Sequence, residues 1–376
     1  MNKRIQLSTP TMHGEEMIYV NEAFEKNWIA PLGFNCDNFE VEICEYLSKN
    51  IPNKYHSLAL SSGTAALHLA VKLAKIKRGD KVFCSDMTFA ATVNPISYEG
   101  GEQVFIDSEV ETWNMDPESL ELAFKKYPDV KVVMLAHLYG TPAKMDEITD
   151  ICNRHGAILI EDAAEALSAT YKGRQCGTFG RLNAISFNGN KIITTSGGGM
   201  LITECESDRA YAFKLATQAR EPAPWYQHEE IGYNYRMSNV VAGIGRGQLM
   251  HLEEHRELKT KIYEAYKEGF ADLPIRMNPY LEYSKPNFWL SCILIDDDCT
   301  VDPMTVIEHL AKKNIEARPI WKPMHMQPVF KNCDFISASD APVNEKIFKK
   351  GLCLPSDIKM TEEEQAYVIK AVKECF

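Results

Sequence analysis

Between residues 57 and 205 the chain alternates short apolar runs with segments of helical periodicity. The apolar runs are Leu58–Leu60, Lys81–Cys84, Gln103–Ile106, Val130–Ala136 and Ala157–Ile160. Thr64–Lys75 and Ala143–His155 have the spacing of helices, and Gly156 supplies a C-terminal stop for the second. Strands that alternate with helices at this spacing predict an α/β fold with a mainly parallel sheet, covered on both faces.

The C-terminal third has a different pattern. A long charged helix over about Met237–Gly269 leads to a strand at Phe288–Ile295, a helix at Pro303–Lys313 and a last helix from about Thr361. The 376 residues exceed one ordinary domain. We therefore predict a large domain over residues 1–245 and a smaller α/β domain over residues 246–376.

Composition restricts the class of protein. The chain has 45% hydrophobic and 25% charged residues, which is typical of soluble globular proteins, and no apolar stretch long enough to cross a bilayer. Its first residues lead into no hydrophobic signal region, and its eleven cysteines are scattered without a Cys-x-x-Cys pair. We expect free thiols and a cytoplasmic location. The net charge of −11 disfavours nucleic-acid binding.

Three polar segments are predicted to meet at one edge of the sheet. Ser62-Gly63-Thr64, Asp162 and Lys191 each follow or lie near the end of a strand-like run, and ligands of such sheets bind beyond the carboxyl ends of the strands. A lysine can bond to the aldehyde of pyridoxal 5'-phosphate (PLP), and an acid can keep its ring nitrogen protonated. Taken singly, a lysine is usually a solvated surface residue and such an aspartate a turn or cap residue. The order and spacing of the segments therefore carry this interpretation.

Other residues fit the same cofactor. Gly63-Thr64-Ala65 opens a helix directly after a strand, which makes a phosphate cradle or, alternatively, an ordinary N-cap. Ser186 could add a hydroxyl to the phosphate. Phe89 could stack on the pyridine ring or be a core aromatic residue.

Two patterns compete with this chemistry. Residues 251–255, His-Leu-Glu-Glu-His, match the inverted zinc-peptidase string, with His251 and His255 one turn apart on a helix. The helix is highly charged, so we expect it to be solvated and expect no metal site. Gly243–Gly247 resembles a dinucleotide loop, but no strand precedes it, and close helix packing is the better interpretation.

From near residue 5 to near residue 370 the chain resembles the sugar aminotransferases of the DegT/DnrJ/EryC1/StrS family. The motifs are Ser62–His68, Thr88–Thr92, His137–Gly140, Glu161–Glu165, Ser186–Lys191 and Gly232–Met237. The resemblance implies a fold-type-I PLP-dependent transferase, similar to aspartate aminotransferase. Asn27–Gly33, Asn188–Met200 and Glu316–Pro323 look most like the UDP-bacillosamine-type 4-aminotransferases.

The resemblance also implies roles for single residues. Lys191 bonds to the cofactor and moves a proton, Asp162 pairs with the ring nitrogen, and Glu165 lies near the 3-hydroxyl group. The implied phosphate ligands are Thr64, Ala65, Ser186 and, from a neighbouring subunit, Asn234, so the active unit would be a homodimer. The implied nucleotide-sugar contacts are Asn27, Ile29, Ala30, Arg318, Trp321 and His325.

The implied reaction moves an amino group from L-glutamate to C4 of a UDP-4-keto-6-deoxy-N-acetylhexosamine, for a bacillosamine-type glycan or an exopolysaccharide. A dTDP-linked sugar, amination at C3, a non-catalytic PLP-binding regulator and a zinc hydrolase are the alternatives. One position departs from the resemblance. Phe288 stands where close relatives carry arginine, which indicates either a different substrate or a packing variation.

Overall fold

The computed structural model describes residues 3–49 and 54–376, and a sheet of eight strands forms the centre of this described part. In spatial order the strands are β1 (His56–Leu60), β9 (Gly199–Thr203), β8 (Leu182–Ser186), β5 (Ile158–Asp162), β4 (Val132–Ala136), β2 (Lys81–Ser85), β3 (Glu102–Ile106) and β14 (Asp334–Ile336). Strand β9 runs antiparallel to both of its neighbours, and the remaining pairs are parallel. The predicted α/β class with a mainly parallel sheet is confirmed.

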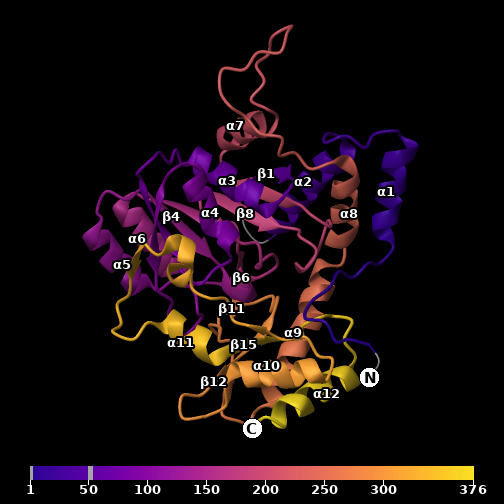
Figure 1. Ribbon diagram of the computed structural model, residues 1–376. Helices are drawn as coiled ribbons and strands as arrows, with labels where there is room; N and C mark the ends of the chain where they lie inside the picture. The colour runs from indigo at the N-terminus through magenta and orange to yellow at the C-terminus, as the bar shows by residue number, and fades with distance from the viewer. Residues whose placement is uncertain (1–2, 50–53) are drawn as a thin grey trace.

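Helices cover both faces of this sheet (Figure 1). They are α2 (Phe34–Leu47), α3 (Gly63–Leu73), α4 (Ala90–Tyr98), α5 (Pro117–Lys126), α6 (Met145–His155), α7 (Glu206–Ala216) and α8 (Asn239–Leu249), and α1 (Glu15–Glu25) packs against α8. In β4, Val132 and Met134 pack in the cluster formed with α3, α4 and α7, whereas Val133 and Leu135 pack with α5 and α6. Because alternate side chains of a strand point to opposite faces, a strand buried on both sides is continuously apolar.

The C-terminal part forms a second, antiparallel sheet of four strands among the described residues, β10 (Ile275–Met277), β12 (Ser291–Ile295), β15 (Gly351–Leu354) and β13 (Arg318–Pro319). Its helices are α9 (Leu252–Gly269), α10 (Pro303–Lys312), α11 (Val343–Lys350) and α12 (Glu362–Lys373). Short elements complete the described chain, namely β6 (Thr170–Tyr171), β7 (Arg174–Gln175), β11 (Ser284–Lys285) and 3-10 turns at Leu138–Gly140, Met324–Met326 and Pro328–Phe330. Strand β14 leaves this part and joins the large sheet beside β3.

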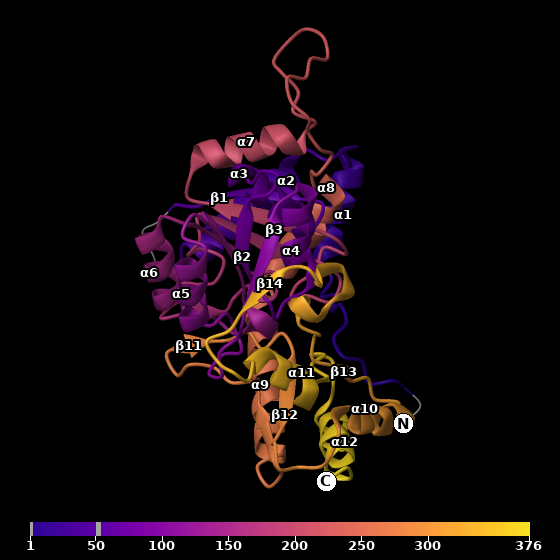
Figure 2. The same cartoon turned by 60° about the vertical axis from the view of Figure 1, so that its left-hand side comes forward.

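The expected single helix over 237–269 is wrong, because the chain forms two helices, α8 and α9. The break lies at Met250 and His251, and His251 has φ −108° and ψ 5° as the N-cap of α9. Helix α8 lies along the part built on the eight-stranded sheet, called the large part. Helix α9 runs down into the part built on the four-stranded sheet, called the small part (Figures 1 and 2). The chain therefore changes direction inside a charged segment whose sequence pattern predicts a single helix.

The glycines of α8 allow close helix packing, as predicted. A Cβ atom on Gly245 would lie 2.6 Å from Cζ of Phe39 in α2, and one on Gly247 would lie 2.5 Å from the backbone nitrogen of Glu16 in α1. Only a residue without a side chain permits this approach. The Gly243–Gly247 segment therefore serves packing between helices.

A long loop between α7 and α8 projects from the body of the molecule (Figure 2). Its apolar side chains Trp225, Tyr226 and Ile231 are exposed in the isolated chain. No helix within residues 3–49 and 54–376 combines the length and apolar character needed to cross a membrane.

Candidate active site

A cavity of about 790 Å³ lies where the carboxyl ends of the large-sheet strands face the small part. Its lining includes Thr64 after β1, Phe89 after β2, Asp162 and Glu165 at and after β5, Ser186 at the end of β8, Lys191, Trp289, Arg318 and Trp321. The structure brings the three predicted segments together at this edge of the sheet. The small part supplies the opposite wall.

Asp162 is fixed as the last residue of β5. Its Oδ2 accepts a hydrogen bond from Oγ1 of Thr92 at 2.6 Å, and its Oδ1 accepts one from the backbone N–H of Ala164 at 3.0 Å. The Thr92 hydroxyl lies 2.6 Å from that of Thr88, so it can accept a hydrogen bond from Thr88 while it donates one to Asp162. Two hydrogen-bond donors therefore hold this carboxylate in one orientation.

Lys191 reaches the same cavity from the loop after β8. Its Nζ lies 3.4 Å from Oε1 of Glu165 and 4.1 Å from the ring centroid of Trp289. The Trp289 indole N–H donates to the carbonyl oxygen of Asn190 at 2.6 Å, which fixes the ring beside the lysine. The amine is therefore enclosed by one carboxylate and one aromatic face.

Glu165 is buried between Lys191 and the turn after β4. Burial raises the pKa of its carboxyl group to about 7, although the nearby Lys191 ammonium and the Tyr139 backbone N–H, 2.7 Å from Oε2, both oppose the rise. The backbone of Tyr139 has φ 52°, and this strained conformation directs its N–H to the carboxyl group. The Glu165 carboxyl group therefore gains and loses its proton near neutral pH.

We expect the stability of the cofactor-free protein to fall as pH rises through the interval from about 4.5 to about 7, and the Glu165→Gln variant to lack this component. In that interval the unfolded chain has lost the Glu165 proton and the folded chain retains it, so rising pH favours unfolding by up to ~3 kcal/mol. Denaturant unfolding of both proteins at a series of pH values measures the difference. Parallel pH profiles would contradict the shifted pKa.

The start of α3 has the geometry that the predicted phosphate cradle requires. Ser62 caps the helix, and its hydroxyl accepts the Ala65 backbone N–H at 3.0 Å. The amides of Gly63 and Thr64 belong to the first helical turn, which has no intrahelical acceptors, and both residues line the cavity. Ala65 was expected to bind phosphate, but its amide is engaged by the cap and it is absent from the residues lining the cavity.

Two glycines bring this helix start against the end of β8 and the start of β9. A Cβ atom on Gly63 would lie 3.0 Å from Cβ of Ser186, and one on Gly199 would lie 2.3 Å from the backbone nitrogen of Gly63. The Ser186 hydroxyl is thereby placed beside the free amides. The cradle depends on backbone packing that a methyl group would block.

The Gly199→Ala variant should therefore lose PLP affinity by at least about tenfold and lose about 1–3 kcal/mol of stability, because the added methyl group displaces the start of α3. Gly197→Ala is the matched control, since a Cβ atom there meets nothing within 4 Å although Gly197 also lines the cavity. Cofactor titration and thermal unfolding of both variants measure the effect. Equal affinities would show that the cradle tolerates the shift.

An aromatic wall continues from the lysine. Trp289 and Trp321 lie 6.2 Å apart between ring centroids, Tyr139 lies 5.1 Å from Trp321, and Phe89 lies 5.5 Å from Trp321. The Tyr139 hydroxyl accepts the Trp321 backbone N–H at 3.0 Å. Phe89 is largely exposed and lines the cavity, so it is not the core aromatic that one interpretation of the sequence suggested.

Several expected site residues lie outside the cavity of the single chain. Asn27, Ile29 and Ala30 are exposed in the turn between α1 and α2, and Asn234 is exposed at the base of the projecting loop. His325 is held by buried Asp86, whose Oδ1 and Oδ2 lie 2.7 Å from the histidine backbone nitrogen and Nδ1. None of these residues is among those that line the cavity.

Phe288 also lies outside the cavity lining, which favours the packing interpretation of this departure. Its ring stacks on Tyr263 at 4.0 Å between centroids and meets Tyr280 edge-on at 5.5 Å. Its φ of 48° keeps it out of β12, which begins at Ser291 and not at Phe288 as expected. The same turn delivers Trp289 to Lys191.

Sequence reasoning assigned no role to Trp289 or Thr92. Trp289 is 98 positions from Lys191, and no local pattern relates the two residues. Thr88 and Thr92 have the i, i+4 spacing of neighbours on one helix face, which could have identified them as a hydrogen-bonded pair. Their connection to Asp162 depends on the packing of α4 against the sheet.

The residues present fit PLP. The cavity offers an amine at Lys191, an anion at Asp162, and free helix-start amides beside Ser186 for a phosphate. When bound, PLP supplies an electron-accepting ring that stabilises negative charge at the substrate Cα. The fold and this set of groups define a PLP-dependent aminotransferase of fold type I.

Comparisons with known proteins agree with this class. The model of the DegT/DnrJ/EryC1/StrS aminotransferase family matches residues 10–373, and the chain belongs to this family. It is 48% identical to the putative pyridoxal phosphate-dependent aminotransferase EpsN of Bacillus subtilis, over 100% of this chain and 97% of the relative. It is 33% identical to GDP-perosamine synthase of Caulobacter vibrioides, over 98% of this chain and 97% of that relative.

A solved structure agrees with the family. A crystal structure of a DegT DnrJ EryC1 StrS aminotransferase from Brucella abortus superposes with a TM-score of 0.87 at 25% identity, covering 96% of this chain and 95% of that one. The chain is a PLP-dependent sugar aminotransferase.

Proposed function

We propose that this enzyme transfers the amino group of L-glutamate to C4 of a UDP-4-keto-6-deoxy-N-acetylhexosamine. The observation that carries the transamination is Lys191, with its amine inside the cavity that also contains Asp162. The choice of sugar is supported by the likeness of Asn27–Gly33, Asn188–Met200 and Glu316–Pro323 to bacillosamine-type enzymes. The amino sugar would serve a glycan or an exopolysaccharide.

The geometry supports the roles that the family resemblance implies. Nζ of Lys191 accepts the proton from the donor Cα and returns it, while its neighbours Glu165 and Trp289 keep the amine in place. The Asp162 carboxylate holds a proton at the ring nitrogen, and Thr92 orients that carboxylate. We assign Arg318 and Trp321 to the nucleotide sugar, and their position in the cavity lining supports this assignment.

We propose a homodimer as the active unit. The exposed apolar residues Trp225, Tyr226 and Ile231 of the projecting loop, and Trp28 and Ile29 near α1, are the kind of surface that a second copy covers. Such an arrangement would allow Asn234, Asn27 and Ala30, which lie outside their own chain's cavity lining, to reach the site of the partner. A cytoplasmic location is proposed with it, since all eleven cysteines are free thiols.

Keto sugars linked to other nucleotides are rival acceptors. The similarity to GDP-perosamine synthases makes a GDP-linked keto sugar a rival, in addition to the dTDP-linked sugars and the C3 regiochemistry considered from the sequence. A few contacts in the pocket recognise the nucleotide base and the position of the keto group on the sugar ring. These contacts can change while the cofactor site is retained.

One spectroscopic cycle tests the proposal. Glutamate is added to the PLP-loaded enzyme to bleach the visible band of the bound cofactor, and UDP-, GDP- and dTDP-linked 4-keto-6-deoxy sugars are then added to separate samples. Recovery with the UDP sugar alone supports the whole proposal, and product analysis by nuclear magnetic resonance gives the aminated carbon. Recovery only with the GDP or dTDP sugar would reject the substrate and retain the aminotransferase.

A further inference from the structure

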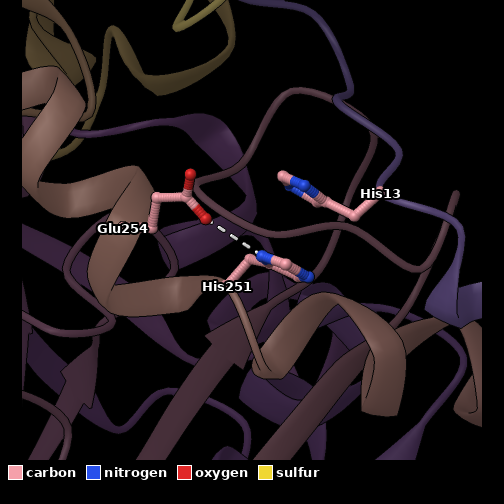
Figure 3. A group of neighbouring side chains, drawn as sticks. All are labelled: His13, His251 and Glu254. Atoms are coloured by element: carbon pink, nitrogen blue, oxygen red, sulfur yellow. Dashed lines mark hydrogen bonds and ion pairs between the residues drawn. The ribbon is translucent and has the colours of Figure 1, made fainter.

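Three potential metal ligands meet outside the active-site cavity, at the junction of α8 and α9 (Figure 3). His13 comes from the segment before α1, and His251 and Glu254 come from the start of α9. One nitrogen from each histidine and one carboxylate oxygen all lie within 4.8 Å of one another. Residues 238 positions apart in the chain thus converge on one point.

A chain of hydrogen bonds favours a free lone pair on His13. Nδ1 of buried His255 lies 2.7 Å from the carbonyl oxygen of Ile192, which can only accept, so this Nδ1 carries the proton. The Nε2 atoms of His255 and His13 lie 2.7 Å apart, so one donates a hydrogen bond to the other. When Nε2 of His13 is the donor in this bond, Nδ1 of the same ring is the nitrogen left for a ligand.

His251 is held in the same manner. Its Nε2 lies 3.2 Å from Oε2 of Glu15, and its Nδ1 lies 3.0 Å from Oε2 of Glu254. A carboxylate that accepts the N–H on the far side of a ligating histidine is the usual outer partner in metal sites. Glu15 can fill that position and leave Nδ1 of His251 and the Glu254 oxygen for one cation.

We propose that His13, His251 and Glu254 bind a divalent transition-metal ion such as zinc. Two imidazole nitrogens and one carboxylate oxygen are a ligand set that zinc accepts, with water completing the coordination. The His13 and His251 rings are stacked at 3.7 Å between centroids and must tilt toward the ion, which their half-buried positions permit. This site is unlike the zinc-peptidase arrangement considered from the sequence, because His255 acts as an outer partner and His13 replaces it.

The ion would join the N-terminal segment to the α8–α9 junction. That segment also contains Leu7 and Ser8, which line the active-site cavity, and the outer partner His255 bonds to the residue next to Lys191. Metal binding would therefore stabilise one wall of the cavity. Its role is structural, since the three ligands are not part of the cavity lining.

Titration of zinc chloride into the PLP-loaded, chelator-dialysed enzyme tests the site by calorimetry. We expect one zinc ion per chain and a Tm raised by a few degrees. His13→Asn and His251→Asn should each weaken binding by more than about tenfold, and Glu15→Gln by about tenfold. His309→Asn is the matched control, because His309 also pairs with a carboxylate, Glu374 at 3.1 Å, but on α10 far from the cluster.

X-ray absorption of the zinc-loaded enzyme identifies the ligand atoms independently of any variant. Nitrogen and oxygen neighbours are expected, whereas sulfur neighbours at about 2.3 Å would place the ion on free cysteines. Absence of saturable binding, or equal affinity in the wild type, His13→Asn and His251→Asn, would overturn the proposal. The PLP absorbance of each variant confirms that it is folded.

Discussion

Replacing Lys191 with alanine should lower turnover by at least ~10⁴-fold and remove covalent attachment of the cofactor. The side chain provides the amine that bonds to PLP and the base that moves the Cα proton, so both functions are lost together. Among its neighbours, Glu165 lies 3.4 Å away, but a carboxyl group cannot replace the amine in the bond to the PLP aldehyde. The measurement is single-turnover kinetics with glutamate, with mass spectrometry after borohydride reduction.

Lys322 offers a matched control because it is a second lysine that lines the cavity. Lys322→Ala should keep the reduced cofactor adduct on Lys191, whatever its effect on substrate affinity. An adduct that persists in Lys191→Ala and disappears in Lys322→Ala would show that the covalent residue has been wrongly assigned. Addition of a small primary amine to Lys191→Ala should restore part of the proton-transfer rate.

The Asp162→Asn variant should retain the fold and lose roughly 10²–10³-fold in kcat. Asparagine can still accept the Ala164 N–H and can pair with the Thr92 hydroxyl in the reverse direction, so the local geometry is kept. The negative charge is lost, and a neutral amide cannot hold a proton on the ring nitrogen. Stopped-flow measurement of the glutamate half-reaction isolates this step.

Thr92→Val separates charge from orientation. Valine has nearly the shape of threonine and removes only the hydroxyl that donates to Oδ2 of Asp162 at 2.6 Å. We expect a loss of about tenfold, much smaller than that of Asp162→Asn, because the carboxylate remains charged. If both variants lost the same activity, orientation and not charge would be the contribution of Asp162.

Much of the large sheet was predictable, since each strand carries its own signal. The runs Leu58–Leu60 and Lys81–Cys84 correspond to β1 and β2, and Asp162 ends β5 as its position after an apolar run indicated. Strands buried on both faces are continuously apolar, and the turns that follow them are polar. These properties are local, so sequence patterns report them.

Elements set by contacts between distant segments were not predictable. Strand β14 is three residues long, and only its pairing with β3 defines it. The residues next to Phe288 in the sequence do not predict its φ of 48°. In the fold, this conformation occurs together with stacking of the Phe288 ring on Tyr263. The break between α8 and α9 lies at His251, in a segment whose composition favours a helix throughout. The His251 ring is hydrogen-bonded to Glu15 of α1, a contact between distant segments.

The sequence by itself determined the order of the chemical groups: the capped glycine turn at Gly63, the acid at Asp162 and the lysine at Lys191, each after its own strand. The tertiary structure decided what surrounds them. Trp289 meets Lys191 and His13 meets His251 only because the small part and the N-terminal segment pack against the large sheet. Spacing along the chain fixes which groups can share one edge of a parallel sheet, whereas contacts across 98 or 238 positions arise from burial of many residues at once, which no single segment encodes.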